Sequence, residues 1–256
     1  MQKNNNRGLS LIGILITLAC VVALMSIYLT SVSKSISGTK GKSSSTSAWG
    51  MIDKIQLLQI GNALRIDSEM NGQYLTPSKL SRSGDAQDNT SANFWSAMLL
   101  QQLITPEALV SKTDPSWVEK AQPDYRARFW DPNFSADLSS TFNVSFAHMP
   151  LWEDRLDKKW SSSSRKFPLL SNRGPQDGIE HSASITLDDD GIWRGWVYFS
   201  DHSIDWVEGT TITAKWRRRD GVQRDTIFLD ESDSADDAML GFTLEMDDNG
   251  PTYSWD

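Results

Sequence analysis

Two acidic stretches in the C-terminal third carry the side chains best suited to binding chemistry. Asp188 and Asp190 stand before Gly191, and Asp247 and Asp248 lie in a second acidic run nearer the C-terminus. Carboxylate oxygens are preferred ligands of calcium, so each stretch is a candidate calcium site. No carboxylate follows the first stretch at the spacing of an EF-hand loop. Solvated polar turns are the favoured interpretation of both stretches, and the sequence indicates no cofactor.

Side chains that would support catalysis are sparse. The single cysteine, Cys20, lies inside an apolar run, and the histidines, His148, His181 and His202, show no ligand-like spacing. The chain has no Gly-x-Ser-x-Gly motif, phosphate-binding loop or zinc-binding His pair. The sequence therefore predicts no enzymatic activity. It also predicts a C-terminal domain held together by packing, without disulfides.

Tryptophan offers another kind of recognition chemistry. Ten of the eleven tryptophans fall between Trp95 and Trp255. Indole rings build cores, and their faces also bind sugars and peptides. Trp130, Trp152 and Trp160 lie in a segment with weak periodicity and are the candidates for a binding surface. Core or loop packing is the favoured interpretation of these three residues.

The charge distribution bears on the choice of partner. The chain has 25 Lys and Arg against 33 Asp and Glu, a net charge of −8. After Arg224 there are ten acidic residues and no basic one. Nucleic-acid-binding domains usually carry a basic surface, so nucleic acid is not an expected partner.

The N-terminal third contains the element that would position such a domain. Residues 9–33 form an uncharged run of 25 residues, which as a helix would extend about 37 Å and cross a bilayer core. Lys3 and Arg7 precede this run and favour a cytoplasmic N-terminus, although Lys34 and Lys40 flank its other end. We expect a single-pass protein of the cytoplasmic (inner) membrane, with its C-terminal domain in the periplasm or outside the cell.

Three interpretations of the N-terminal segment predict different processing. A plain anchor would stay intact, whereas a secretory signal would be cut near Ser31–Ser33. The third follows from Gly8 and the residues after it, Leu9-Ser10-Leu11-Ile12, which resemble the cleavage and methylation segment of type IV pilins and type II secretion pseudopilins. This resemblance implies cleavage between Gly8 and Leu9 by a prepilin peptidase, and assembly with other pilin-like subunits.

Two positions depart from the pattern of that family. The fifth residue after the cleavage point is usually Glu, which pairs with a neighbouring subunit, whereas this chain has Gly13. The first residue is Leu9, where the family prefers Phe. A carboxylate in lipid is costly unless it is paired, so Gly13 removes both the cost and the docking partner. These departures favour a minor or non-shaft member.

A long helix is predicted to follow the Ser-, Gly- and Lys-rich linker 34–47. It should begin near Ala48, end at Asn71-Gly72 and be kept from resuming by Pro77. The segment Gln56–Pro77 is similar to the end of the first helix in pseudopilin-like proteins. The helix is apolar on two sides, so both sides should need a covering. The broad side comprises Met51, Ile52, Ile55, Leu58, Ala63, Ile66 and Met70, and the second side comprises Leu57, Ile60 and Leu64.

Strand signals dominate the C-terminal part of the chain. Residues 196–207 predict one β-hairpin, and residues 211–229 predict another around Asp220-Gly221. The first hairpin resembles the one that ends the pilin-like family with an H-x9-D-G pattern, although His202 stands where the family has glycine. Because this pattern is incomplete, the resemblance extends to fold and topology and not to any ligand.

These observations combine into one predicted architecture. We expect an α+β protein in which a long N-terminal helix, half transmembrane and half amphipathic, packs on a C-terminal antiparallel β-sheet. The expected parts are a leader, 1–8, a membrane helix, 9–33, a linker, 34–47, and an extracytoplasmic domain, 48–256. The leading functional hypothesis is a pilin-like structural subunit of a type II secretion or type IV pilus-like assembly. The alternative is a membrane-tethered module that binds a glycan or a protein and does not assemble.

Overall fold

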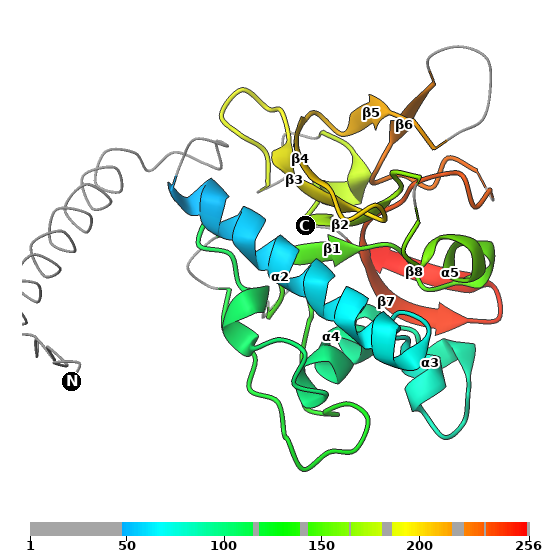
Figure 1. The fold of residues 1–256 in the computed structure, drawn as a ribbon. Helices are drawn as coiled ribbons and strands as arrows, with labels where there is room; N and C mark the ends of the chain where they lie inside the picture. The colour runs from blue at the N-terminus through cyan, green and yellow to red at the C-terminus, as the bar shows by residue number, and fades with distance from the viewer. Residues whose placement is uncertain are drawn as a thin grey trace, which may run out of the picture. The chain divides into compact units, whose positions relative to one another are not determined.

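The longest helix described in the computed structural model is α2, Ala48–Asn71 (Figure 1). The structure describes residues 48–256 except 115–117, 139–142, 164, 181–185, 217–222, 233 and 255–256. The helix ends where the sequence predicts. Gly72 has a φ of +79° and its amide donates to the Ser68 carbonyl at 2.8 Å. Glycine adopts this left-handed conformation at no steric cost, which explains the stop.

The segment after α2 differs from its prediction at one residue. Pro77 was expected to keep a helix from forming, but it is the first residue of a short helix, α3, Pro77–Leu80. Proline is tolerated there because the amide it lacks would have no intrahelical partner. Helix α4, Ser91–Leu100, follows, and the Thr90 hydroxyl caps its first turn. Residues 106–109 form a single 3₁₀ turn.

Four antiparallel strands form the central sheet in the order β1-β2-β3-β4. The predicted first hairpin is confirmed as β3 and β4, with Trp196 opposite Trp206 and a turn at residues 200–203. Strand β1 comes from the weakly periodic segment and pairs with β2. The bounds are β1 Phe146–His148, β2 Pro168–Asn172, β3 Arg194–Phe199 and β4 Ile204–Glu208.

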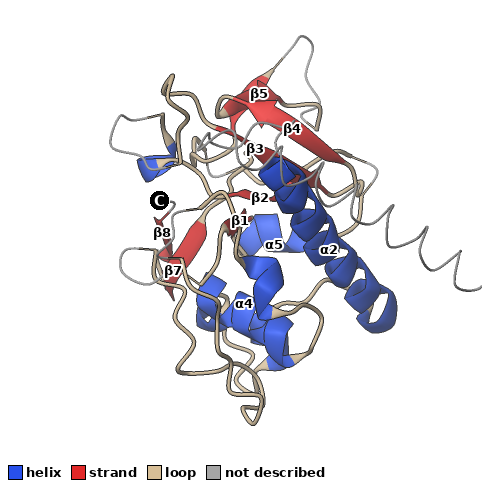
Figure 2. Cartoon of the chain, turned by 90° about the vertical axis from the view of Figure 1, so that its left-hand side faces the viewer, coloured by secondary structure: helices blue, strands red, loops and turns tan. Residues whose placement is uncertain are grey.

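Two smaller ladders flank this sheet. Strands β5, Thr211–Thr213, and β6, Arg224–Thr226, pair as the predicted second hairpin, whose turn lies outside the described residues. Strands β7, Phe242–Asp247, and β8, Gly250–Ser254, form a hairpin that the sequence did not predict. Figure 2 shows the two ladders well apart. Helix α5, Glu153–Lys159, is also an addition to the sequence prediction.

A single hydrophobic core joins α2 and α4 to the sheet. Helix α2 packs on β2 and β3, and Gly61 makes this approach possible because a Cβ atom there would lie 2.2 Å from the Tyr198 ring. The expectation that tryptophan builds the core holds for Trp95, Trp193 and Trp196, which are buried. The described domain is therefore a mixed α+β structure with an antiparallel sheet.

Candidate functional site

The inner face of α2 is the second apolar side identified in the sequence. Leu57, Ile60 and Leu64 are fully buried, and their spacing of three and four residues places them on one side of the helix. Near the start of the helix, the Trp196 indole N–H donates to the Gly50 carbonyl at 2.6 Å. These contacts fix the position of α2 on the sheet.

A buried carboxylate lies on this inner face. Asp53 accepts hydrogen bonds from the Ser111 hydroxyl at 2.6 Å, the Thr113 hydroxyl at 3.0 Å and the Asn172 amide at 3.1 Å. Its side chain is fully buried, and the loss of solvation raises its pKa from 3.8 to about 6 despite these three donors. Asp53 therefore ties α2 to the 111–113 loop and to β2.

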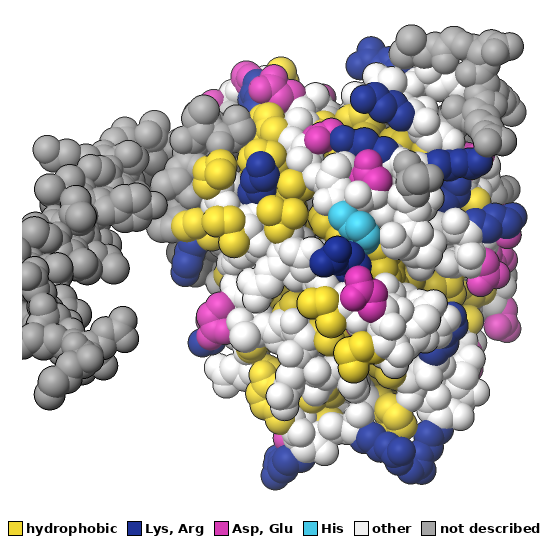
Figure 3. Space-filling model, viewed as in Figure 1, with side chains coloured by type: hydrophobic (Ala, Val, Ile, Leu, Met, Phe, Trp, Pro, Cys, Tyr) yellow, Lys and Arg dark blue, Asp and Glu magenta, His cyan; other side chains and the backbone are white. Residues whose placement is uncertain are grey.

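The opposite face of α2 carries exposed apolar residues among polar ones such as Gln59 and Asn62, and nothing in the described domain covers it. Met51, Ile55, Ile66 and Met70 are 44, 60, 51 and 78 % exposed, and they are four of the eight large hydrophobic residues that are exposed in this part. We call these four residues the outer stripe. Figure 3 shows hydrophobic side chains gathered over the N-terminal half of α2. The second predicted side is thus covered, whereas the broad side is covered only in part, because Ala63 is buried and Leu58 packs against the core while the outer stripe is exposed. Exposed apolar patches commonly mark interaction surfaces.

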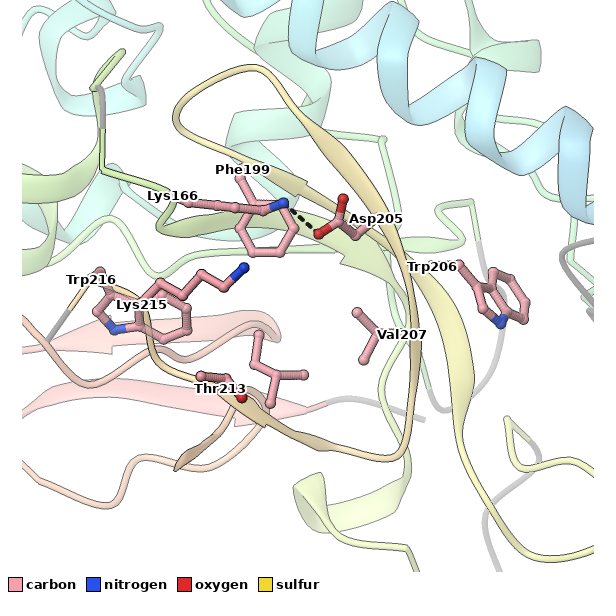
Figure 4. A pocket seen from close by; sticks show the side chains of 9 residues that line it. Lys166, Phe199, Asp205, Trp206, Val207, Thr213, Lys215 and Trp216 are labelled. Atoms are coloured by element: carbon pink, nitrogen blue, oxygen red, sulfur yellow. Dashed lines mark hydrogen bonds and ion pairs between the residues drawn. The ribbon is translucent and has the colours of Figure 1, made fainter. Parts of the chain in front are cut away.

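A second feature is a cavity of about 220 Å³ between β4 and the end of β5, which we call the β4–β5 cavity (Figure 4). Its apolar walls include the buried side chains of Phe199, Val207 and Trp216. Two ammonium groups reach it from segments far apart in the sequence, Lys166 before β2 and Lys215 after β5. The sequence analysis did not identify either lysine as part of a site.

The charges in this cavity are unevenly paired. Lys166 forms an ion pair with Asp205, and its ammonium also lies 4.6 Å from the centroid of the Phe199 ring. Lys215 makes no ion pair among the described residues, and in Figure 4 its ammonium points into the cavity. Among the described residues that line it, the cavity thus combines apolar and polar side chains with one positive charge that has no ion pair.

Asp188 and Asp190, the first pair of calcium candidates, form ion pairs with an arginine of the same chain. Arg194 forms ion pairs with Asp188 at 2.9 Å and with Asp190 at 2.7 Å. The hydrogen bonds from Arg194 lower the pKa of Asp190 to about 2. The guanidinium thus provides the countercharge that a metal would otherwise supply. Calcium binding at this turn stays a prediction.

The second pair of calcium candidates lies at the tip of the β7–β8 hairpin. Asp247 and Asp248 are exposed, and Asp247 accepts a hydrogen bond from the Asn249 amide at 2.7 Å, which stabilises the turn. The structure brings together the members of each candidate pair. The two pairs differ in their partners, because Arg194 contacts the first pair and the Asn249 amide contacts Asp247 of the second. Calcium binding at the tip also stays a prediction.

A further acidic cluster joins residues that the sequence analysis did not connect. One carboxylate oxygen each from Asp225, Glu231 and Asp237 lies within 4.8 Å of the others. Asp237 is fully buried and accepts backbone hydrogen bonds from Glu231 at 2.7 Å and Ser232 at 2.9 Å. The Arg155 guanidinium lies 3.4 Å from Asp237. These contacts explain the cluster, because Asp237 holds the acidic loop in place.

One buried Ser–His pair has the composition of a catalytic dyad. The Ser91 hydroxyl lies 2.6 Å from His148 Nε2, and His148 Nδ1 lies 2.6 Å from the Met149 carbonyl. Both side chains are fully buried, and desolvation lowers the pKa of His148 to about 4, so the ring is neutral near pH 7. Because no substrate can reach a sealed hydroxyl, this pair serves the core.

The three tryptophan candidates have different environments. Trp160 is buried, and its indole N–H donates to the Leu75 carbonyl at 3.0 Å, which confirms the core interpretation. Trp130 and Trp152 are half-buried. Neither of these two lines the β4–β5 cavity.

Comparisons with protein families, characterised proteins and solved structures return no match.

The processing and membrane predictions concern residues beyond the described domain. Gly8 and Leu9, the predicted cleavage residues, lie outside the described part, as do the membrane run 9–33 and the linker 34–47. Among the helices that the structure does describe, none is long and apolar enough to cross a membrane.

Proposed function

We propose that this protein is a pilin-like structural subunit, a minor or non-shaft member of a type II secretion or type IV pilus-like assembly. In this proposal the chain is inserted in the inner membrane and trimmed between Gly8 and Leu9 by a prepilin peptidase. The domain 48–256 then lies outside the cytoplasm, and its function is to contact other pilin-like subunits.

The outer stripe is the observation that carries the proposal. Its four residues occupy one side of α2, while the opposite side is held in the core by Leu57, Ile60 and Leu64. A surface helix ordinarily presents polar residues to water. Exposed apolar side chains at this spacing are instead suited to packing against a second helix. Residues 9–33 add an apolar run upstream of the same helix.

The mass of the mature N-terminus tests the processing step. The chain should be purified from membranes of its native host and its N-terminal peptide identified by mass spectrometry. We expect a start at Leu9, with methylation of the amino group. A start at Lys34 or an intact Met1 would contradict the proposal, because either excludes cleavage by a prepilin peptidase.

Cysteine cross-linking tests the assembly surface. In a Cys20→Ser background, Ile55→Cys places a thiol on the outer stripe, and Gln87→Cys places one at an exposed position elsewhere. We expect cross-linked multimers from the first variant only. Equal cross-linking of the two, or none from either, would refute a role for the stripe in assembly.

The alternative function is a membrane-tethered module that binds a partner without assembling. Gly13, which stands where the family has its docking Glu, and the β4–β5 cavity support this alternative. A start at Leu9 together with a stripe that does not cross-link would favour it.

A further inference from the structure

The β4–β5 cavity has the chemistry of a small binding site. Three buried side chains, Phe199, Val207 and Trp216, supply apolar walls, and Lys215 directs an ammonium group into the space between them (Figure 4). The other charges that line the cavity, Lys166 and Asp205, neutralise each other. Counting the described lining residues, the site therefore presents one excess positive charge beside apolar side chains.

We propose that this cavity binds a carboxylate carried on a small apolar body. The carboxylate would pair with the Lys215 ammonium, and the apolar body would fill the space beside Val207 and Ile212. This inference does not depend on the proposed pilin-like function. It adds a recognition site on the sheet, remote in sequence from α2.

The size and charge of the cavity set the class of ligand. Its volume of about 220 Å³ is below the ~300–1,000 Å³ of sites for drug-sized ligands, so it suits a group about the size of one aromatic side chain. A monoanion balances the single excess charge, whereas a dianion would leave an uncompensated charge beside apolar walls. A carboxylate meets both conditions, whether it belongs to a free organic acid or to an acidic residue beside an aromatic one in a peptide.

Binding of phenylacetate by the full chain in detergent tests the proposal, with phenylacetamide as the neutral probe of the same shape. Calorimetric titrations are compared with those of detergent alone. A charge-assisted hydrogen bond predicts that phenylacetate binds at least about tenfold more tightly than phenylacetamide. We choose about 0.5 M salt as a second condition. The preference for phenylacetate should weaken there, because the cavity is open to solvent and salt screens its charge.

Matched variants assign the effect to the cavity. Lys215→Met keeps the apolar stem and removes the charge, so it should lose the preference for the carboxylate. Lys158→Met makes the same change on exposed helix α5, outside the cavity, and should bind as the wild type does. Thr213→Lys adds a second ammonium at the rim and should tighten binding several-fold. Near-UV circular dichroism shows whether each variant is folded. If Lys215→Met does not fold, the comparison of Thr213→Lys with the wild type tests the proposal.

Two peptides distinguish the sources of the carboxylate. If a protein partner supplies it, acetyl-Phe-Glu-amide should bind more tightly than phenylacetate and more tightly than acetyl-Phe-Gln-amide. If a free acid is the ligand, phenylacetate should bind more tightly than either peptide. The proposal is overturned if carboxylate and amide probes bind equally, if Lys215→Met retains the preference, or if neither phenylacetate nor the Glu peptide binds.

Discussion

Ionisation of Asp53 should destabilise the fold, and Asp53→Asn should remove this effect. The carboxylate is fully buried on the inner face of α2 and accepts hydrogen bonds from Ser111, Thr113 and Asn172. Burial raises its pKa from 3.8 to about 6. The folded state therefore binds the Asp53 proton more tightly than the unfolded state does. The stability that this contributes is fully present below pH 4 and is lost as the pH rises through 6.

The magnitude follows from the same shift in pKa. A rise from 3.8 to about 6 corresponds to about 3 kcal/mol of unfolding free energy, lost between pH 4 and pH 7. Asparagine has a similar shape and cannot ionise, so Asp53→Asn should lack this loss. The difference in unfolding free energy, variant minus wild type, should therefore be about 3 kcal/mol larger at pH 7.5 than at pH 4.

Urea unfolding followed by tryptophan fluorescence measures this difference. Both proteins are unfolded at pH 4 and at pH 7.5 under otherwise identical conditions, so other titrating groups cancel in the comparison. Asp157→Asn makes the same change of charge at an exposed position of α5 and should show no comparable difference between the two pH values. A parallel pH dependence in wild type and Asp53→Asn would show that burial does not control this carboxylate.

Three further perturbations probe the core and its ion pairs. The pKa of buried His148 is lowered from 6.5 to about 4, so as the pH falls from 6.5 to 4 the wild type should lose about 3 kcal/mol of unfolding free energy relative to His148→Phe, measured by urea unfolding. Gly61→Ala places a Cβ atom 2.2 Å from the Tyr198 ring and should cost roughly 1–3 kcal/mol in the same assay. Arg155→Met removes the cation beside buried Asp237 and should lower the unfolding free energy by roughly 3–5 kcal/mol; a smaller loss from Arg155→Lys would show that charge carries part of the effect.

The sequence predicted the elements whose signals are local. Helix α2 and its stop at Gly72 follow from a 3.6-residue period and one glycine, and the β3–β4 hairpin follows from alternation on both sides of a turn. Helix α5 escaped prediction because its sequence, EDRLDKK, is almost entirely charged and has no apolar period. What anchors it is remote, since Arg155 of α5 bonds to Asp230, 75 residues away.

The candidate sites were harder to predict for the same reason. The partners of Asp53 come from residues 58 to 119 positions further along the chain, so its helical position alone gave no sign of burial. The β4–β5 cavity brings Lys166 and Lys215 together only after the sheet has formed. A single sequence carries no periodic signal for pairs at such separations.

Two features of α2 depart from the pattern that folding alone would favour. The inner face buries the carboxylate of Asp53, whereas the outer face leaves Ile55 and Met70 largely in water. Exchanging the two kinds of residue would remove a desolvation cost and an exposed apolar surface together. The buried carboxylate of Asp53 accepts three hydrogen bonds, and these bonds fix α2 on the sheet. No contact within the described domain accounts for the outer stripe, and this exposed apolar surface is why we propose that α2 packs against another subunit.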